Sequence, residues 1–132
     1  MLSRYTMYRG KPPAGESLPN GIRQDTRKHT RHILRPPEEL VVAFLNGDGT
    51  HTWDEFREQY LHCLEARFEE DTSKFAERAD LAGENNVFIG CSCPTKKNPD
   101  IKHCHTILAL EFMKDRFPEL PVEFPPNYKP SE

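Results

Sequence analysis

The chain has 132 residues, the usual size of one domain, which leaves little room for a second hydrophobic core. Its 18 lysines and arginines and 21 aspartates and glutamates give a net charge of -3 at pH 7, which argues against the broad basic face that binds nucleic acid through its phosphates. No stretch approaches the roughly 20 apolar residues of a membrane-spanning helix, and the first residues lack the apolar core of a signal peptide, so we expect a cytoplasmic protein.

The first part of the chain is poor in apolar residues. Arg4 to Arg9 is typical of a short strand, which the glycine and prolines that follow it end. Residues 10–36 are rich in glycine, proline and charge, which predicts mostly loop, with one short strand near Gly21 to Thr26. This loop is the most cationic segment of the chain, and its basic residues are Arg23, Arg27, Lys28, Arg31 and Arg35. Either the whole segment is solvated, or one of its arginines folds over the functional site.

Three helices are predicted in the middle of the chain. Pro36-Pro37 followed by two glutamates indicates a helix start, because proline suits the first turn and acidic side chains suit the positive end of the helix dipole. Thr52 and Glu55 form a capping box before a long run of apolar residues at helical spacing. Near Asp71 this helix breaks or is capped again, and a shorter helix continues to Gly83.

The last part of the chain returns to strand and then helix. Asn86 to Gly90 contains Val-Phe-Ile, which is typical of a buried strand with helices on its faces. A polar loop over Pro94 to His103 precedes a helix over Thr106 to Phe117, which the next proline ends. An edge strand over Leu120 to Phe124 stays open.

The order of these elements predicts a single small α/β domain over residues 1–125, followed by a loose tail over 126–132. We expect a short, mainly parallel sheet flanked by helices. Its strands would be Arg4 to Arg9, Val87 to Gly90 and up to two further short ones.

Cysteine and histidine side chains flank the polar loop. Cys91 and Cys93 leave the predicted strand with one residue between them, so their side chains point the same way on an extended chain. Cys104 and His105 begin the next helix, where free amide groups and the helix dipole lower the pKa of a thiol and attract anions. Because α/β proteins place ligands where a strand, a loop and a helix converge, we expect the functional site here.

Three interpretations of these residues stay open. Free cysteine is most often a small buried hydrophobe, which is one interpretation of Cys91. The second is a zinc ion held by Cys91, Cys93, Cys104 and His105 or the histidine before Cys104, although a single residue between two cysteines is unusual for structural zinc. The third is a reactive or anion-binding thiol, in which Cys104 or Cys93 is the catalytic thiolate and His105 is a base or hydrogen-bond donor.

The leading functional hypothesis is an enzyme or binding protein for a small anionic compound, with nucleotide-like compounds among the candidates. The alternative is a small zinc-binding structural or interaction module. The candidate anion ligands are basic side chains, each of which could equally be solvated: Lys96, Lys97, Lys102 and Arg35. The histidines with no ligand set beside them are expected to be structural or solvent-exposed: His29, His32, His51 and His62. Whether the protein is an enzyme, and whether it forms oligomers, stays open.

One segment shows a family resemblance. The run L-R-P-P-E-E-L is followed by W-D-E-F-R-E-Q-Y-L, and later an apolar strand with Cys91 precedes Cys104-His105. From Ile33 to Phe117 the chain thus resembles bacterial and phage proteins grouped as domain of unknown function 488. The Cys-Ser-Cys-Pro and Cys-His segments are also similar to domain of unknown function 4326. The resemblance implies a compact α/β fold with the Cys-His pair at a pocket, and it implies no reaction. The arginine that follows this pair in the first family is Thr106 here, which removes an anion contact.

Overall fold

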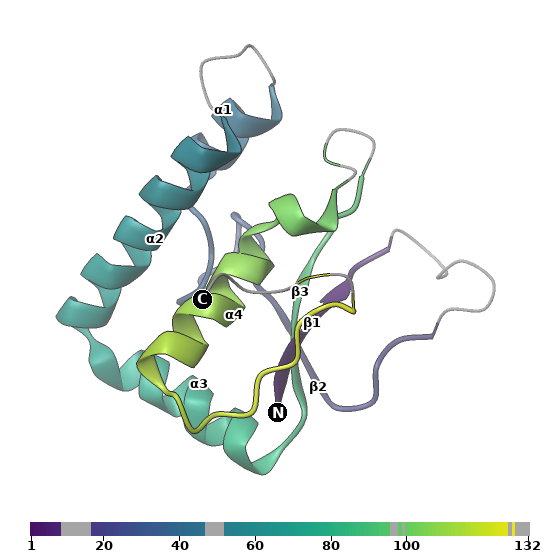
Figure 1. Ribbon diagram of the computed structural model, residues 1–132, viewed down its shortest axis with the longest axis vertical. Helices are drawn as coiled ribbons and strands as arrows, with labels where there is room; N and C mark the ends of the chain where they lie inside the picture. The colour runs from purple at the N-terminus through teal and green to yellow at the C-terminus, as the bar shows by residue number, and fades with distance from the viewer. Residues whose placement is uncertain (9–16, 47–51, 96–97, 99, 127, 129–132) are drawn as a thin grey trace.

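A computed structural model describes residues 1–8, 17–46, 52–95, 98, 100–126 and 128 of the chain (Figure 1). In these residues, three parallel strands form one sheet in the order β1-β3-β2, with bounds Leu2–Thr6 for β1, Val87–Cys91 for β3 and Ile22–Asp25 for β2. Both outer strands pair with β3 from Val87 onward, opposite Leu2 on one side and Ile22 on the other. The carboxyl ends of all three strands therefore meet at one edge of the sheet.

Within the described part of the chain, four α-helices and one short 3-10 helix, η1, accompany the sheet. Their bounds are Glu38–Leu45 for α1, Trp53–Glu70 for α2, Thr72–Glu84 for α3, Ile101–His103 for η1 and His105–Arg116 for α4. Helix α4 contacts β1 and β3 on one side and α2 on the other, so it lies between the sheet and α2 (Figure 1). Because both sides of α4 are covered, eight of its twelve residues are buried. The structure confirms the predicted small α/β domain with a short parallel sheet and flanking helices.

Apolar side chains from every layer form one core. The sheet contributes Leu2, Val87 and Ile89, and α4 contributes Leu108, Leu110 and Met113, all of which are almost fully buried. Aromatic side chains of α2 and α3 fill the space on the far side of α4: Phe56, Tyr60, Phe68 and Phe75. This continuous core holds α4, and with it the first turn that carries Cys104, against the sheet.

Strand β1 lies nearer the N-terminus than the sequence predicted. The expected strand began at Arg4 and ended at Arg9, but β1 covers Leu2–Thr6, because its five residues pair with the five residues of β3. Leu2 is buried in the core, whereas Tyr8 is 38% exposed. The pattern of tyrosine and methionine in the predicted strand thus gave the wrong boundaries.

The other predicted elements lie close to their expected positions. The strand near Gly21 to Thr26 is β2, and the helix expected over Thr106 to Phe117 is α4, shifted by one residue. The segment after α4 forms an isolated bridge between Val122 and Leu2 on the free side of β1. The backbone N–H of Leu2 donates to the carbonyl of Pro121 at 2.8 Å, which reinforces that bridge. The sequence Asn46-Gly47-Asp48-Gly49 predicts the end of α1, and its last three residues lie outside the described residues.

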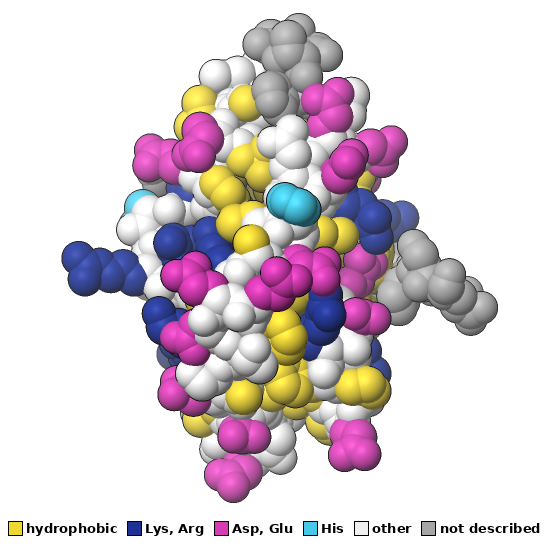
Figure 2. Space-filling view, turned by 90° about the vertical axis from the view of Figure 1, so that its left-hand side faces the viewer, with side chains coloured by type: hydrophobic (Ala, Val, Ile, Leu, Met, Phe, Trp, Pro, Cys, Tyr) yellow, Lys and Arg dark blue, Asp and Glu magenta, His cyan; other side chains and the backbone are white. Residues whose placement is uncertain are grey.

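On the face shown in Figure 2, surface charge is mixed rather than concentrated. Among the described side chains of the face in Figure 2, acidic groups alternate with basic and hydrophobic ones, and no broad basic area covers that face. Within the described ranges, no helix is both long and apolar enough to cross a membrane.

Candidate metal centre

Three cysteine thiols meet at the carboxyl end of the central strand. Cys91 is the last residue of β3, Cys93 follows two residues later, and Cys104 is the N-cap of α4. Their Sγ atoms all lie within 4.8 Å of one another, and those of Cys91 and Cys93 are 3.8 Å apart. Two sulfur atoms bound to one tetrahedral zinc ion at about 2.3 Å are themselves about 3.8 Å apart. The three thiols are free and lie close enough together that they could hold one metal ion.

Two hydrogen-bond donors point at these sulfur atoms. The Nδ2 atom of Asn98, a buried residue, donates to Cys93 Sγ at 3.4 Å and to the carbonyl of His103 at 2.6 Å. The hydroxyl of Thr106, which is fully buried, donates to Cys104 Sγ at 3.1 Å. Donors directed at sulfur stabilise the thiolate, which is the form that binds metals.

The thiols share their negative charge unequally. Burial alone raises the pKa of Cys104, but hydrogen bonds from Cys91 and Cys93 and the neighbouring His105 outweigh burial and hold this pKa well below its usual range. The hydrogen bond to Cys104 is also the main cause that raises the pKa of Cys93 to about 11 and the pKa of Cys91 still further. Among the three thiols, Cys104 is therefore the one whose surroundings most favour the negative charge.

The imidazole of His105 is held by a threonine from the neighbouring strand end. Thr26 Oγ1 donates its single hydrogen to the carbonyl of Gly90 at 3.0 Å. The contact of 3.0 Å between Thr26 Oγ1 and His105 Nε2 must therefore be a hydrogen bond donated by Nε2. Nε2 of His105 is therefore already engaged in a hydrogen bond. Among the described residues, no histidine or carboxylate joins the three cysteines at metal-binding distance.

A pocket of about 400 Å³ lies beside the thiols. One wall is polar, with the cations Arg27 and Lys28 and the imidazole of His29, and the other is apolar, from Val41, Phe44 and Phe56. The cations have partners, since Arg27 Nη2 lies 2.8 Å from a carboxylate oxygen of Asp25, and Lys28 Nζ lies 3.6 Å from Glu38. The hydrogen bond from Arg27 is the main cause that lowers the pKa of Asp25.

The predicted anion ligands lie in different places. Arg35 lines a separate pocket together with Arg67, and its Nη1 donates to the carbonyl of His32 at 3.1 Å. Lys102 lies on η1 and does not line the cysteine pocket, while Lys96 and Lys97 are outside the described residues.

Two residues of the basic segment bear on the expectations. Among its described arginines, Arg27 lines the pocket, while His29 lines it too and is exposed, as expected. His103 stacks on Trp53 with ring centroids 4.9 Å apart, and it lines the same pocket. His51 is outside the described residues.

Sequence reasoning missed the polar residues that surround the thiols, namely Arg4, Thr26, Asn98 and Thr106. Arg4 and Thr26 are separated from the cysteines by more than sixty residues, and no local pattern marks them. Thr106 directly follows the Cys-His pair, but it was considered only for the arginine that it replaces. Its hydrogen bond to sulfur depends on the first turn of α4, which the sequence did not place to the residue.

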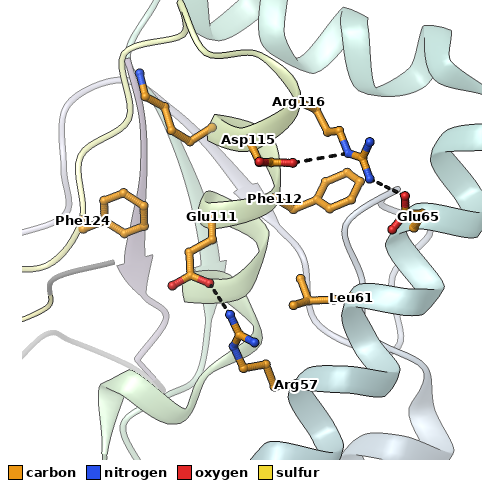
Figure 3. A pocket seen from close by; sticks show the side chains of 9 residues that line it. Arg57, Leu61, Glu65, Glu111, Phe112, Asp115, Arg116 and Phe124 are labelled. Carbon is orange, nitrogen blue, oxygen red and sulfur yellow. Dashed lines mark hydrogen bonds and ion pairs between the residues drawn. The ribbon is translucent and has the colours of Figure 1, made fainter. Parts of the chain in front are cut away.

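A second pocket, of about 490 Å³, lies between α2 and α4 (Figure 3). Most of its charged groups are paired, since Arg57 lies 3.5 Å from Glu111 and Arg116 lies 2.5 Å from Glu65. Burial is the main cause that raises the pKa of Glu111. The described residues that line this pocket include no cysteine or histidine, in contrast to the pocket beside the three thiols.

Comparisons of the chain with protein-family models, with curated proteins and with solved structures found no match. The resemblance to domain of unknown function 488 stays a prediction. We therefore argue function from the geometry of the three thiols and their pocket.

Proposed function

We propose that Cys91, Cys93 and Cys104 bind one zinc ion, and that the pocket beside them receives a small anionic compound as the fourth ligand of the metal. The observation that carries this proposal is the cluster of three Sγ atoms within 4.8 Å. Zinc prefers thiolate ligands, whereas magnesium and calcium prefer oxygen ligands. A zinc ion with three protein ligands and one open position is the arrangement found in catalytic zinc sites.

Zinc explains the cluster better than a single reactive thiol. Cys104 is only 2% exposed, so a thiolate there is poorly placed to meet a reagent from solvent. In addition, a lone thiolate does not account for two further thiols and for two hydrogen-bond donors directed at sulfur. A divalent ion bound by three thiolates uses all of them.

The fourth position would face a pocket suited to a small organic anion. Three thiolates outweigh the charge of the ion, so the positive charge that attracts an anion would come from Arg27 and Lys28 in the wall of the pocket, although Asp25 and Glu38 offset part of it. The apolar wall would contact the body of the compound. A volume of about 400 Å³ is within the range of small-molecule sites, which keeps nucleotide-like compounds among the candidates.

The zinc proposal is tested by metal analysis of protein purified without chelator. We expect about one zinc per chain in the wild-type protein and in Cys63→Ser, and little zinc in Cys93→Ser. Cys63 is a matched control because it lies on α2 and lines a different pocket. Cobalt(II) should replace zinc and show intense absorption in the near ultraviolet from thiolate coordination.

The outcome that contradicts zinc is a metal-free protein that takes up neither ion. If Cys104 of such a protein were alkylated by iodoacetamide well below pH 8.5, about the pKa of a free thiol, the reactive-thiol hypothesis would replace zinc.

The ligand is tested on the zinc-loaded and zinc-free protein with inorganic phosphate and nucleoside phosphates. A compound at a hundred times its dissociation constant should stabilise the zinc-loaded protein by about 2.7 kcal/mol in a thermal unfolding experiment. If no anion shifts the unfolding temperature of the zinc-loaded protein, the anionic ligand is wrong, whereas the zinc site stands.

A further inference from the structure

Arg4 contacts both segments that supply the thiols. Its Nη2 atom donates to the backbone carbonyl of Cys93 at 3.0 Å, and its Nε atom donates to Thr106 Oγ1 at 2.9 Å. Cys93 belongs to the loop after β3, whereas Thr106 is in the first turn of α4. The guanidinium group, which comes from β1, thus bridges two parts of the centre that are separated along the chain.

Thr106 extends this contact to a sulfur atom. Because its oxygen accepts a hydrogen bond from Arg4, its own hydrogen is free to point at Cys104 Sγ, 3.1 Å away. A second hydroxyl supports the other end, since Thr6 Oγ1 donates to the same Cys93 carbonyl at 2.8 Å and accepts from Arg4 Nη1 at 3.3 Å. Arg4 therefore donates three hydrogen bonds, one each to Thr106, Thr6 and the carbonyl of Cys93.

The register of the sheet explains why a β1 residue reaches this centre. Arg4 pairs with Ile89 and Thr6 pairs with Cys91, so these residues follow one another at intervals of two along neighbouring strands. Residues two apart on a strand lie on the same face of the sheet. That face is the one on which α4 packs, because Arg4 reaches Thr106.

Charge gives the contact a second purpose. Three thiolates around a divalent zinc ion leave a net charge of about -1 on the centre. The guanidinium group is always positive and lies one hydroxyl away from Cys104 Sγ. It would offset that charge beside Cys104 and Thr106, both of which are buried.

We propose that Arg4 is a positioning residue of the metal centre: it fixes Cys93 relative to Cys104 and offsets the negative charge of the three thiolates. This inference rests on the proposed zinc site. Arg4 contacts no sulfur itself and acts through the Cys93 carbonyl and the Thr106 hydroxyl.

The first test compares Arg4→Lys with Arg23→Lys. Lysine keeps the positive charge at position 4 but cannot make the planar set of hydrogen bonds. Arg23 is an exposed residue of β2 and a suitable control. It pairs with Phe88, whereas Arg4 pairs with the next residue of β3, so the two arginines lie on opposite faces of the sheet. Zinc affinity, measured by competition with a chromophoric chelator, should fall by about 10- to 100-fold in Arg4→Lys and should stay within about twofold of wild type in Arg23→Lys.

The second test isolates the hydroxyl with Thr106→Ser and Thr106→Val. Serine keeps the donor to Cys104 Sγ, whereas valine has nearly the shape of threonine but cannot donate. The thiolate-to-cobalt absorption band should match wild type in Thr106→Ser and shift in energy in Thr106→Val, because a hydrogen bond to sulfur changes the energy of its electrons. A residue that only stabilised the fold would leave the band of the loaded protein unchanged.

Circular dichroism checks that each variant is folded, and if Arg4→Lys does not fold, the Thr106 pair decides. Wild-type zinc affinity and an unshifted cobalt band in Arg4→Lys and Thr106→Val would overturn the role of Arg4, while the zinc site would stand. A wild-type protein that binds no metal would overturn both.

Discussion

His32 illustrates how the fold sets the chemistry of a single side chain. The backbone N–H of Leu34 donates to His32 Nδ1 at 3.1 Å, so Nε2 carries the hydrogen and donates to Gln24 Oε1 at 2.8 Å. The pKa of His32 is lowered to about 4, mainly by burial and next by the nearby positive charge of Arg78. The ring is therefore neutral in the folded protein, in a structural position of the kind that the sequence predicted.

We expect His32 to make the protein less stable in mild acid. Its pKa is about 4 when folded and about 6.5 when unfolded, so the unfolded state takes up the proton first as the pH falls. The contribution of the neutral ring is fully present above about pH 6.5 and is lost progressively toward pH 4, by up to about 3 kcal/mol.

Urea unfolding at pH 7, 6 and 5 measures this loss. His32→Gln should remove much of the pH dependence, whereas His62→Gln, at an exposed position of α2, should retain it. An equally steep loss of stability in His32→Gln would show that other groups are responsible.

At the scale of single elements, α2 begins where its capping residues predict. Thr52 Oγ1 accepts a hydrogen bond from the backbone N–H of Glu55 at 3.2 Å, which satisfies one of the free donors of the first turn. Trp53, the first residue of α2, stacks on His103 at the rim of the cysteine pocket. The start of this helix therefore bears on both stability and the shape of the pocket.

Thr52→Ala should lower the free energy of unfolding by about 1 kcal/mol, because the amide of Glu55 loses its acceptor. Thr52→Ser keeps an oxygen in the same place and should remain close to wild type. Denaturant unfolding of the three proteins provides the measurement. If alanine and serine were equally stable, the cap would have no energetic role.

At the scale of the whole molecule, the three thiols bring together the end of the central strand and the start of α4, two segments that otherwise contact each other through the hydrophobic core. Cys91 and Cys93 follow the central strand, and Cys104 begins the helix that lies between the sheet and α2. A metal ion bound by all three would link the sheet directly to that helix. Its binding free energy would then contribute to the stability of the folded state.

Zinc should therefore raise the stability of the protein and release protons as it binds. At a free zinc concentration a hundred times the dissociation constant, the free energy of unfolding should rise by about 2.7 kcal/mol. Because only Cys104 has a lowered pKa, Cys91 and Cys93 should together release roughly two protons per zinc near neutral pH.

Calorimetry in buffers of different ionisation enthalpy counts the protons, and urea unfolding at several zinc concentrations gives the stability. The affinity should fall as the pH is lowered, because protons compete with zinc for the thiols. An unfolding midpoint that did not change with zinc would contradict the link between metal and fold.

Local patterns were sufficient to predict most elements and the segments that carry the thiols. The capping box at Thr52, the prolines before α1 and the apolar run of β3 each act within a few residues, so their signals can be read along the chain. The same holds for Cys91, Cys93 and Cys104, because a strand followed by a loop and a helix returns the chain to the strand end. The sequence by itself therefore determined where the cysteines would gather.

Only the tertiary structure decided what surrounds them. The start of β1 depends on pairing with β3, 85 residues later at Leu2 and Val87, and this register in turn places Arg4 beside the centre. His105, a predicted metal ligand, has its Nε2 taken by Thr26, 79 residues away. These contacts depend on strand register and on how far a side chain reaches, and neither leaves a periodic signal in the sequence.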